Sequence, residues 1–405
     1  MHIALSAMTC SGNGASESLV SYNWLRQISR FNEVDLITAE PHPPLLENVS
    51  ASVVSNEWWP LQFMSDGFRG AVKPHYFIFD RRAGKQCASV VKQADIFHHV
   101  VPQAPRYPSS LGRIAKRFVL GPIGGGLRVP EKFRATVEDS EPLFSRLRNF
   151  DAFRFRYDPW LRGTYQAADK ILLTAPYMLD ILPTEYHNKV EFVAETAIDS
   201  EAFSDDPVDR SNDSEIVLLY VGRITPYKGL EFLLRALAML PAHVTEKTRV
   251  EIVGSGEDKY EQLCRQIVAQ ADLSHRVTFC GRRSKAEVLD HYRSADIFCF
   301  PTLAETTGNV LLEAMAMGLP IVSTNYGGPA AVVHPDAGIL VEPDSPDSFS
   351  SGIAGALENL ITNENLRRSM GEKARQHVIE NLSWNAKGNQ IADIYERLLK
   401  ESEFN

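Results

Sequence analysis

The chain has 405 residues, of which 44% are hydrophobic, and a formal net charge of −9. This length is sufficient for two hydrophobic cores and predicts two domains. The acidic balance argues against a nucleic-acid-binding protein, and the five cysteines contain no CxxC pair that would indicate a zinc framework. No apolar run is long enough to cross a bilayer. We therefore expect a cytoplasmic protein that associates at most with the inner face of the cytoplasmic membrane.

The N-terminal stretch MHIALSAMTC is apolar but has no basic leading region, so it is predicted to be a buried first strand rather than a signal peptide. Strand-like and helix-like segments alternate through the first half of the chain. In chain order they are HIALSAM, SESLVSYNWLRQISR, EVDLITAE, ASVVKQAD, IFHHVV, AADKILLTA and PYMLDIL. Short apolar runs separated by amphipathic segments are typical of βαβ units with a parallel sheet.

The polar stretch FSDDPVDRSNDS, residues 203–214, interrupts this alternation and is predicted to be a linker between domains. A second α/β series follows, beginning with EIVLLYVG and ending with DIFCFPT. The last segment, residues 383–400, has the pattern of an amphipathic helix that can pack on its own domain or return to the first. The sequence therefore predicts an α/β protein with two doubly wound sheets, whose ligands bind at the carboxyl ends of the strands.

The loop VGRITPYKG, residues 221–229, follows a predicted strand directly and carries Arg223 and Lys228. Two cations at the carboxyl end of a strand can hold a diphosphate, since arginine offers a planar fork and lysine a compact charge. The alternative is a surface loop with two solvated charges.

The segment PTLAETTGNVLLEAMAM, residues 301–317, joins a strand end to a helix that is predicted to start near Gly308. Free backbone N–H groups at a helix start favour an anion such as phosphate. Glu305 lies before the helix and Glu313 within it, among apolar neighbours. Because a carboxylate in such surroundings needs a partner, Glu313 is a candidate to accept hydrogen bonds from ribose hydroxyls.

Three glycine-containing loops also follow predicted strands: SGNGASES at 11–18, GPIGGGLRVP at 121–130 and GSG at 254–256. Glycine lets the backbone approach a ligand closely, but it also serves turns and hinges, and both interpretations remain open. The first loop is not a P-loop, because no GK[ST] follows it. His98 and His99 end a strand-like run, and each can be a buried core residue or a substrate contact.

Residues 145–163 concentrate arginine among aromatic side chains, and EWWPLQF at 57–63 adds further aromatic residues. Such a cationic and aromatic patch can meet an anionic membrane or a lipid-pyrophosphate acceptor. The alternative is a set of interior aromatic rings covered by arginine stems.

In their order along the chain, the VGR…KG loop, the GSG turn, the FPT strand end and the two glutamates eight residues apart resemble retaining glycosyltransferases of the GT-B fold, family GT4. The resemblance covers most of the chain and is strongest over residues 216–345. FHHV and GPIGGG are similar to a bacterial subgroup associated with surface-polysaccharide assembly. The resemblance implies an acceptor-binding domain at 1–203, a nucleotide-sugar domain at 204–384, and a helix at 385–405 that returns to the first domain.

The resemblance also implies roles for matching residues. Arg223 and Lys228 would hold the donor diphosphate and stabilise the leaving group, Glu305 would contact the donor sugar, and Glu313 would bind the ribose. Further expected donor contacts are Gly12, Gly14, Gly254, Arg282, Thr307, Gly308 and Asn309. Expected acceptor contacts are Gly124, Gly125 and His98, with His99 as the candidate catalytic histidine.

The expected donor is a UDP- or GDP-sugar, and the expected acceptor is a saccharide or a lipid-linked group, in a retaining transfer. We expect no cofactor and no metal, since no D-x-D motif occurs in the chain. Two departures from the family pattern are Thr306-Thr307 in place of Gly-Phe after Glu305, and Val100 where many members have histidine. The alternatives are a sugar-nucleotide epimerase or phosphorylase of the same shape, and a non-catalytic subunit that binds a partner.

Overall fold

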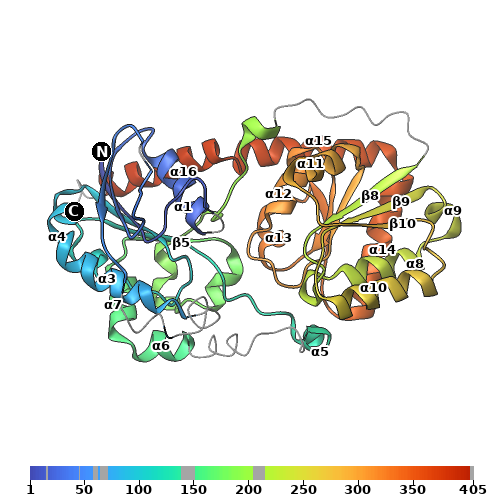
Figure 1. Cartoon of the computed structure of the whole chain (residues 1–405), viewed down its shortest axis with the longest axis horizontal. Coiled ribbons are helices and arrows are strands. Elements are labelled where there is room, and N and C mark those ends of the chain that lie inside the picture. The colour runs from blue at the N-terminus through green and yellow to red at the C-terminus, as the bar shows by residue number, and fades with distance from the viewer. Residues whose placement is uncertain are drawn as a thin grey trace. The chain divides into compact units, whose positions relative to one another are not determined.

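The structure is a computed structural model, and it describes residues 1–14, 17–44, 46–57, 63, 72–137, 151–203 and 215–401. Residues 204–214 of the predicted linker, residues 58–62 of the aromatic stretch and residues 145–150 of the arginine-rich patch lie outside the described residues. The chain divides into two compact units (Figure 1). The first comprises Met1–Gly126, Pro142–Thr196 and Trp384–Asn405, and the second comprises Leu127–Glu141 and Ala197–Ser383.

A seven-stranded parallel sheet forms the centre of the first unit, in the order β3-β2-β1-β4-β5-β6-β7. Its strands are β1 (His2–Ala7), β2 (Glu33–Thr38), β3 (Val49–Val53), β4 (Ile96–Val101), β5 (Phe118–Ile123), β6 (Lys170–Leu173) and β7 (Val190–Phe192). Every residue of β4 and β5 is buried. Strands that are buried on both faces give the continuous apolar runs seen in the sequence.

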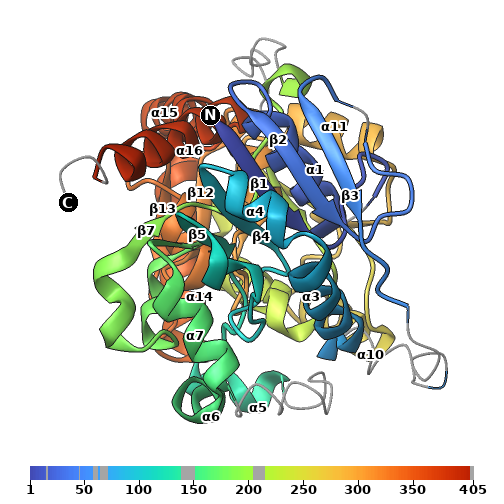
Figure 2. The same cartoon turned by 90° about the vertical axis from the view of Figure 1, so that its left-hand side faces the viewer.

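Helices cover both faces of this sheet. They are α1 (Glu17–Ile28), α3 (Pro74–Gln86), α4 (Ala88–Gln93), α6 (Asp151–Tyr157), α7 (Pro159–Ala167) and α16 (Trp384–Lys400). On one face, Phe97 of β4 belongs to an apolar core with Tyr76 of α3 and Tyr165 of α7. The next residue of β4, His98, points to the other face, where α16 packs against α1 (Figure 2). Trp24 and Trp384 meet edge to face there, with ring centroids 5.6 Å apart.

A six-stranded parallel sheet forms the centre of the second unit, in the order β10-β9-β8-β11-β12-β13. Its strands are β8 (Ile216–Val221), β9 (Thr248–Val253), β10 (Val277–Gly281), β11 (Ile297–Phe300), β12 (Ile321–Thr324) and β13 (Gly338–Val341). The prediction of two doubly wound parallel sheets is therefore confirmed.

The helices of the second unit are α5 (Arg134–Val137), α8 (Leu230–Met239), α9 (Ala242–Thr245), α10 (Asp258–Gln270), α11 (Lys285–Ser294), α12 (Asn309–Ala316), α13 (Gly327–Val332), α14 (Pro346–Thr362) and α15 (Glu364–Asn381). Helices α8, α10 and α14 pack together on one face, and α12 packs with α15 on the other (Figure 1). This division follows from right-handed crossovers that run in opposite directions from β8.

Residues 127–141 belong to the second unit although they lie far from it in sequence. Phe133 is fully buried, and its ring centroid lies 5.3 Å from that of Phe232 and 5.8 Å from that of Phe349. This aromatic cluster anchors the segment to α8 and α14. Among the described residues, no helix combines the length and the apolar character needed to span a membrane.

Candidate functional site

The strand order of the second sheet reverses between β8 and β11, which are adjacent although two strands and four α-helices separate them in sequence. Such a reversal is called a topological switch point, and in open parallel sheets ligands bind there, outside the carboxyl ends of the strands. The loops that leave β8 and β11 here are residues 222–229 and 301–308. These are the loops that carry Arg223, Lys228 and Glu305.

Hydrogen bonds hold the two loops together. The Leu303 N–H donates to the Tyr227 carbonyl at 2.8 Å, and the Thr302 hydroxyl donates to the same oxygen at 3.2 Å. Gly229 has a φ of 72°, and a Cβ at this position would lie 2.0 Å from the Pro301 carbonyl oxygen. Only glycine fits such a contact, so this residue fixes the approach of one loop to the other.

Lys228 and Glu305 form an ion pair between these loops. Their side chains are only 12% and 18% exposed. The Lys228 Nζ also lies 5.4 Å from the Tyr227 ring centroid and 5.3 Å from that of Phe300. The two predicted catalytic groups are thus brought together, although they stand far apart in sequence. An incoming diphosphate would compete with Glu305 for the lysine, because both are anionic.

Arg223 is exposed, and its guanidinium carbon lies 5.6 Å from the Tyr227 ring centroid. The Arg223 backbone is held by the Tyr220 hydroxyl, which donates to its carbonyl at 3.1 Å. Tyr227 therefore supports both cations of the loop. Its role was not recognised from the sequence; the signal was an aromatic residue placed between two basic ones.

Helix α12 starts where the sequence predicted. Gly308 precedes it with a φ of 91°, Thr307 is buried, and Asn309 is exposed at the first position. The Gly328 N–H donates to the Glu305 carbonyl at 2.7 Å, and a Cβ on Gly328 would lie 2.5 Å from the Thr306 carbonyl carbon. The start of α13 therefore supports the loop from behind, a contact that the sequence did not reveal.

Glu313 lies within α12 and is half-buried. Burial raises the pKa of its carboxyl above the ordinary value, while Tyr292 and Lys285 act in the opposite direction. The Tyr292 hydroxyl donates to Glu313 Oε2 at 3.1 Å from α11. The expected partner of this carboxylate is therefore a tyrosine of the neighbouring helix, and the second carboxylate oxygen can accept a ligand hydroxyl.

The glycines of the GSG turn meet the 222–224 loop rather than open space. A Cβ on Gly254 would lie 1.8 Å from the Gly222 carbonyl oxygen, and one on Gly256 would lie 1.8 Å from that of Ile224. The Ile224 N–H also donates to the Ser255 carbonyl at 3.1 Å. This turn therefore positions the loop that carries Arg223. Arg282 is exposed directly after β10.

In the first sheet the order reverses between β1 and β4. The loop after β1 contains Gly12 and Gly14, and the Gly14 N–H donates to the Ser11 carbonyl at 3.2 Å. In the loop after β5, Gly125 has a φ of 88°, which explains the glycine. A Cβ on Gly124 would lie 2.4 Å from Glu195 Oε2, so this glycine gives room to an acidic side chain that the sequence did not single out.

His98 does not fit the predicted role as an acceptor contact. It is fully buried, with Nδ1 2.6 Å from the Tyr395 hydroxyl and Nε2 2.7 Å from the Gly121 carbonyl oxygen. Burial lowers its pKa to about 4, so the imidazole is neutral near pH 7. Since both nitrogens are occupied, His98 is a core residue that joins α16 to the sheet.

His99 is also buried, but neither ring nitrogen makes a hydrogen bond of normal geometry with the described residues. Burial and the neighbouring His98 lower its pKa to about 3, although the Pro102 backbone acts in the opposite direction. Its ring centroid lies 6.0 Å from that of Tyr76. Thus the neutral His99 ring has one donor and one acceptor nitrogen that form no hydrogen bond of normal geometry with the described residues.

Residues 203–377 match the family model for Glycosyl transferases group 1. This range contains the whole switch point of the second sheet. Among curated relatives, an uncharacterized glycosyltransferase of Methanocaldococcus jannaschii is 33% identical over 187 residues, 45% of each chain. A D-inositol 3-phosphate glycosyltransferase of Corynebacterium glutamicum is 33% identical over 183 residues, 44% of this chain and 43% of the relative. The matches thus span less than half the length of these relatives.

Solved structures match over almost the whole chain. A glycosyltransferase from Rickettsia africae aligns with a TM-score of 0.62 and 16% identity over 98% of this chain and 99% of the other. HepE of Anabaena, solved in complex with UDP-glucose, aligns with a TM-score of 0.58 and 16% identity over 98% of this chain and all of the other. The chain therefore has the GT-B fold of these glycosyltransferases, and its second unit carries the sequence features of group 1.

The remaining feature of the site is the set of side chains that could bind a metal ion. In the described ranges, no three side chains of histidine, cysteine, aspartate or glutamate cluster in a way that could hold a metal ion. The charged groups found at the switch point are Arg223, Lys228, Glu305 and, within α12, Glu313.

Proposed function

We propose that this protein is a retaining glycosyltransferase that moves a sugar from a nucleotide-diphosphate sugar to a saccharide or lipid-linked acceptor in bacterial glycan biosynthesis. The observation that carries the proposal is the Lys228–Glu305 pair at the switch point of the second sheet. Arg223 lies on the same loop as Lys228, and helix α12 starts four residues after Glu305, with Gly308 preceding it. Cations, a carboxylate and a helix start are the groups that a sugar diphosphate requires.

In the proposed reaction, the bond between the anomeric carbon and the diphosphate oxygen breaks, and the acceptor oxygen attacks the same face of the sugar. The acceptor proton passes to the departing phosphate oxygen. Arg223 and Lys228 would stabilise the charge that develops on this leaving group, as cations held in position before the reaction do. They would do so without a divalent metal. Glu305, released from Lys228 when the diphosphate binds, would contact the sugar.

Glu313 would accept hydrogen bonds from the ribose hydroxyls. Tyr292 donates to one carboxylate oxygen and leaves acceptor capacity on the other. Because hydrogen bonds from ligand hydroxyls favour the ionised carboxylate, donor binding would weaken as the pH falls through the raised pKa of Glu313.

Glu313→Gln should reduce the affinity for the free nucleoside diphosphate about tenfold, as expected for the loss of hydrogen bonds to a charged acceptor. Titration calorimetry with the unmodified diphosphate measures this directly. Tyr292→Phe is the matched variant, because it alters the partner of Glu313 and keeps the carboxylate. An unchanged affinity in Glu313→Gln would remove Glu313 from the ribose site.

The donor is proposed to be a UDP- or GDP-sugar. UDP is supported by the UDP-glucose complex of HepE, which shares the fold. The acceptor is proposed to be a saccharide or lipid-linked group of a bacterial surface polysaccharide, and His99 and the Gly124–Gly125 loop are the candidate residues on that side. Because residues 203–377 match a glycosyltransferase family and the relatives described are glycosyltransferases, an epimerase, a phosphorylase or a non-catalytic subunit is not favoured.

A thermal-shift panel of UDP-, GDP- and ADP-sugars tests the proposal. A ligand at 100 times its Kd stabilises the folded state by about 2.7 kcal/mol, so one nucleotide class should raise the melting temperature clearly. The stabilising donor is then incubated with candidate acceptors, and product is detected by mass spectrometry. Stabilisation by none of the three classes would contradict the donor assignment.

A further inference from the structure

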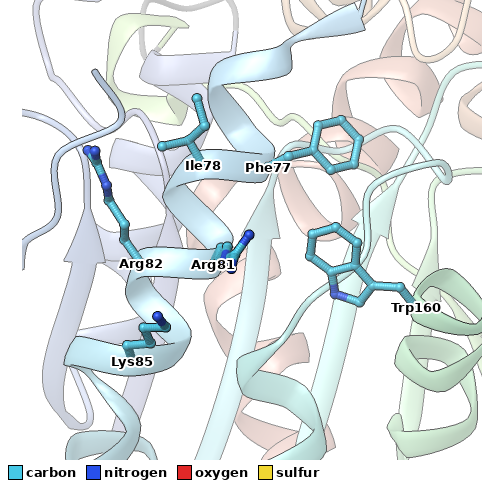
Figure 3. A pocket seen from close by; sticks show the side chains of 6 residues that line it. All are labelled: Phe77, Ile78, Arg81, Arg82, Lys85 and Trp160. Atoms are coloured by element: carbon cyan, nitrogen blue, oxygen red, sulfur yellow. The ribbon is translucent and has the colours of Figure 1, made fainter. Parts of the chain in front are cut away.

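We propose that the first unit carries a binding groove for an anionic lipid, formed between α3 and α7 and separate from the donor site. The groove is a cavity of about 570 Å³ lined by six residues: Phe77, Ile78, Arg81, Arg82, Lys85 and Trp160. Five of them lie on α3 and one on α7 (Figure 3). The proposal rests on this cavity and does not depend on the transferase reaction.

Helix α3 has two distinct faces. Tyr76, Phe79, Asp80 and Ala83 are buried against the sheet. The groove residues follow a spacing of 77, 78, 81, 82 and 85, which places them on one outward stripe of a helix. A stripe that begins with two apolar residues and continues with three cations is amphipathic along its length.

The apolar part of the groove is fixed in position. The ring centroids of Phe77 and Trp160 lie 5.8 Å apart, and the Trp160 Nε1–H donates to Ser110 Oγ at 3.2 Å. The Ser110 hydroxyl in turn donates to the buried Asp80 carboxylate. Trp160 is therefore held by a chain of hydrogen bonds that ends in the core, so this wall exists before a ligand arrives.

The charged part of the groove has unused capacity. Arg82 donates to the Ser55 carbonyl at 2.9 Å, whereas Arg81 and Lys85 are exposed and make no ion pair or hydrogen bond with any described residue. None of the six lining residues is acidic. In a chain of net charge −9, such a local excess of cations favours an anionic ligand.

A fourth cation, from α6, adjoins the groove. The Arg154 guanidinium lies 5.9 Å from the Phe77 ring centroid and is fixed by Asp158 at 2.7 Å. On the same helix, Phe153 and Tyr157 are 59% and 58% exposed, with ring centroids 4.7 Å apart. Exposed aromatic rings beside arginines are typical of surfaces that contact lipid headgroups.

The chemistry of the lining selects the ligand class. Apart from the three cations, the lining consists of apolar and aromatic side chains, so it offers little to read the hydroxyls of a sugar or the edges of a base. Hydrocarbon fits against Phe77, Ile78 and Trp160, and a phosphate fits between Arg81 and Lys85. An anionic phospholipid at a membrane surface provides both parts in one molecule.

The test measures binding of the full chain to vesicles by sedimentation. Wild-type protein should bind phosphatidylcholine vesicles that contain phosphatidylglycerol and should bind pure phosphatidylcholine much more weakly. The double variant Arg81→Gln/Lys85→Gln should lose about fivefold in partition coefficient for each cation, about 25-fold together. Ile78→Ser should weaken binding without changing the charge.

Lys92→Gln/Lys247→Gln is the matched control, because it removes two exposed charges outside the groove, one in each unit. It should keep almost all of the vesicle binding. The proposal would be overturned if the two double variants lost binding equally, if wild-type protein did not bind the anionic vesicles, or if pure phosphatidylcholine bound equally well. The proposal would also be overturned if inorganic phosphate, at a concentration equal to that of the lipid phosphate, released the protein from the vesicles. A site for phosphate alone would then explain the binding.

Discussion

Gly254 and Gly355 are both glycines, but the structure places opposite demands on them. Gly254 has a φ of 142°, and a Cβ there would lie 1.8 Å from the Gly222 carbonyl oxygen. Gly355 lies in α14, and an added Cβ would meet no atom within 4 Å beyond its chain neighbours and the backbone of its own helix. The first glycine is required by a contact between two loops, and the second only weakens a helix.

Gly254→Ala should therefore destabilise the second unit by more than about 2 kcal/mol, because the clash is with backbone. Gly355→Ala should stabilise the protein by about 0.5–1 kcal/mol, as expected for removing glycine from a helix interior. Chemical denaturation of both variants measures the two effects. Equal effects of the two substitutions would contradict the assigned backbone contact.

Asp80 is a buried carboxylate that titrates in an unusual range. Burial raises its pKa to about 6, although Ser110, Tyr76 and Arg113 act in the opposite direction. A carboxyl with a raised pKa in the folded state contributes stability at low pH, and that contribution is lost as the pH rises from the unfolded value through the folded one.

The free energy of unfolding should thus fall by about 2 kcal/mol between pH 4 and pH 7 through this residue, because most of the effect of a pKa raised to about 6 lies in this range. Asp80→Asn should remove this part of the pH dependence, because the amide does not titrate. Urea unfolding at several pH values, with both proteins compared, measures it. Identical pH profiles would show that Asp80 titrates at its ordinary pKa.

Among the secondary-structure elements, the candidate site of the second unit depends on contacts between two loops. Residues 222–229 and 301–308 follow adjacent strands, and Thr302 and Leu303 of the second loop both donate to the Tyr227 carbonyl of the first. Lys228 from one loop and Glu305 from the other form the ion pair at their junction. Since each group is partly buried, removing either one leaves an unpaired charge on its partner.

Lys228→Met and Glu305→Gln should each lower kcat by about 10²–10³-fold if the two groups act on the leaving group and the sugar. The double variant should be little worse than either single variant, because residues that act as a unit are not additive. Steady-state kinetics with the identified donor measures the cycle. Lys259→Met is the control, since this exposed lysine of α10 lies outside the loops. Fully additive losses would contradict a shared role.

Across the complete chain, the C-terminal helix α16 belongs to the first unit, together with the N-terminal residues. Helix α16 packs on α1, and its Tyr395 hydroxyl lies 2.6 Å from His98 Nδ1 in the buried centre of the first sheet. The segment at 127–141 follows the first unit in sequence but belongs to the second, where Phe133 packs with Phe232 and Phe349. Each unit thus depends on a segment that is distant in sequence.

Tyr395→Phe should destabilise the first unit by about 1–3 kcal/mol, because a buried imidazole nitrogen loses its partner. The donor affinity should remain unchanged, since Arg223, Lys228 and Glu305 belong to the second unit. Calorimetric unfolding together with nucleotide titration measures both quantities. Tyr157→Phe, at an exposed position, should have no effect on either. A loss of donor affinity in Tyr395→Phe would contradict this separation.

The amino-acid sequence alone was sufficient to predict the fold class and to select the loops of the candidate site. Apolar runs and 3.6-residue periodicity record which residues are buried, so they predicted both parallel sheets and the start of α12 near Gly308. The loops with Arg223 and Glu305 were found because functional loops follow strand ends. Glu313 was predicted to need a partner, but the local sequence pattern could not show that this partner is Tyr292.

Contacts between residues that are distant in sequence became apparent only in the folded structure. Lys228 pairs with Glu305, and the GSG glycines contact the 222–224 loop. His98 lies in the core between Tyr395 and Gly121. The folded structure also contains the groove between α3 and α7. These contacts join residues whose separation in sequence leaves no periodic signal, because they arise from the packing of whole elements rather than from local conformational preference.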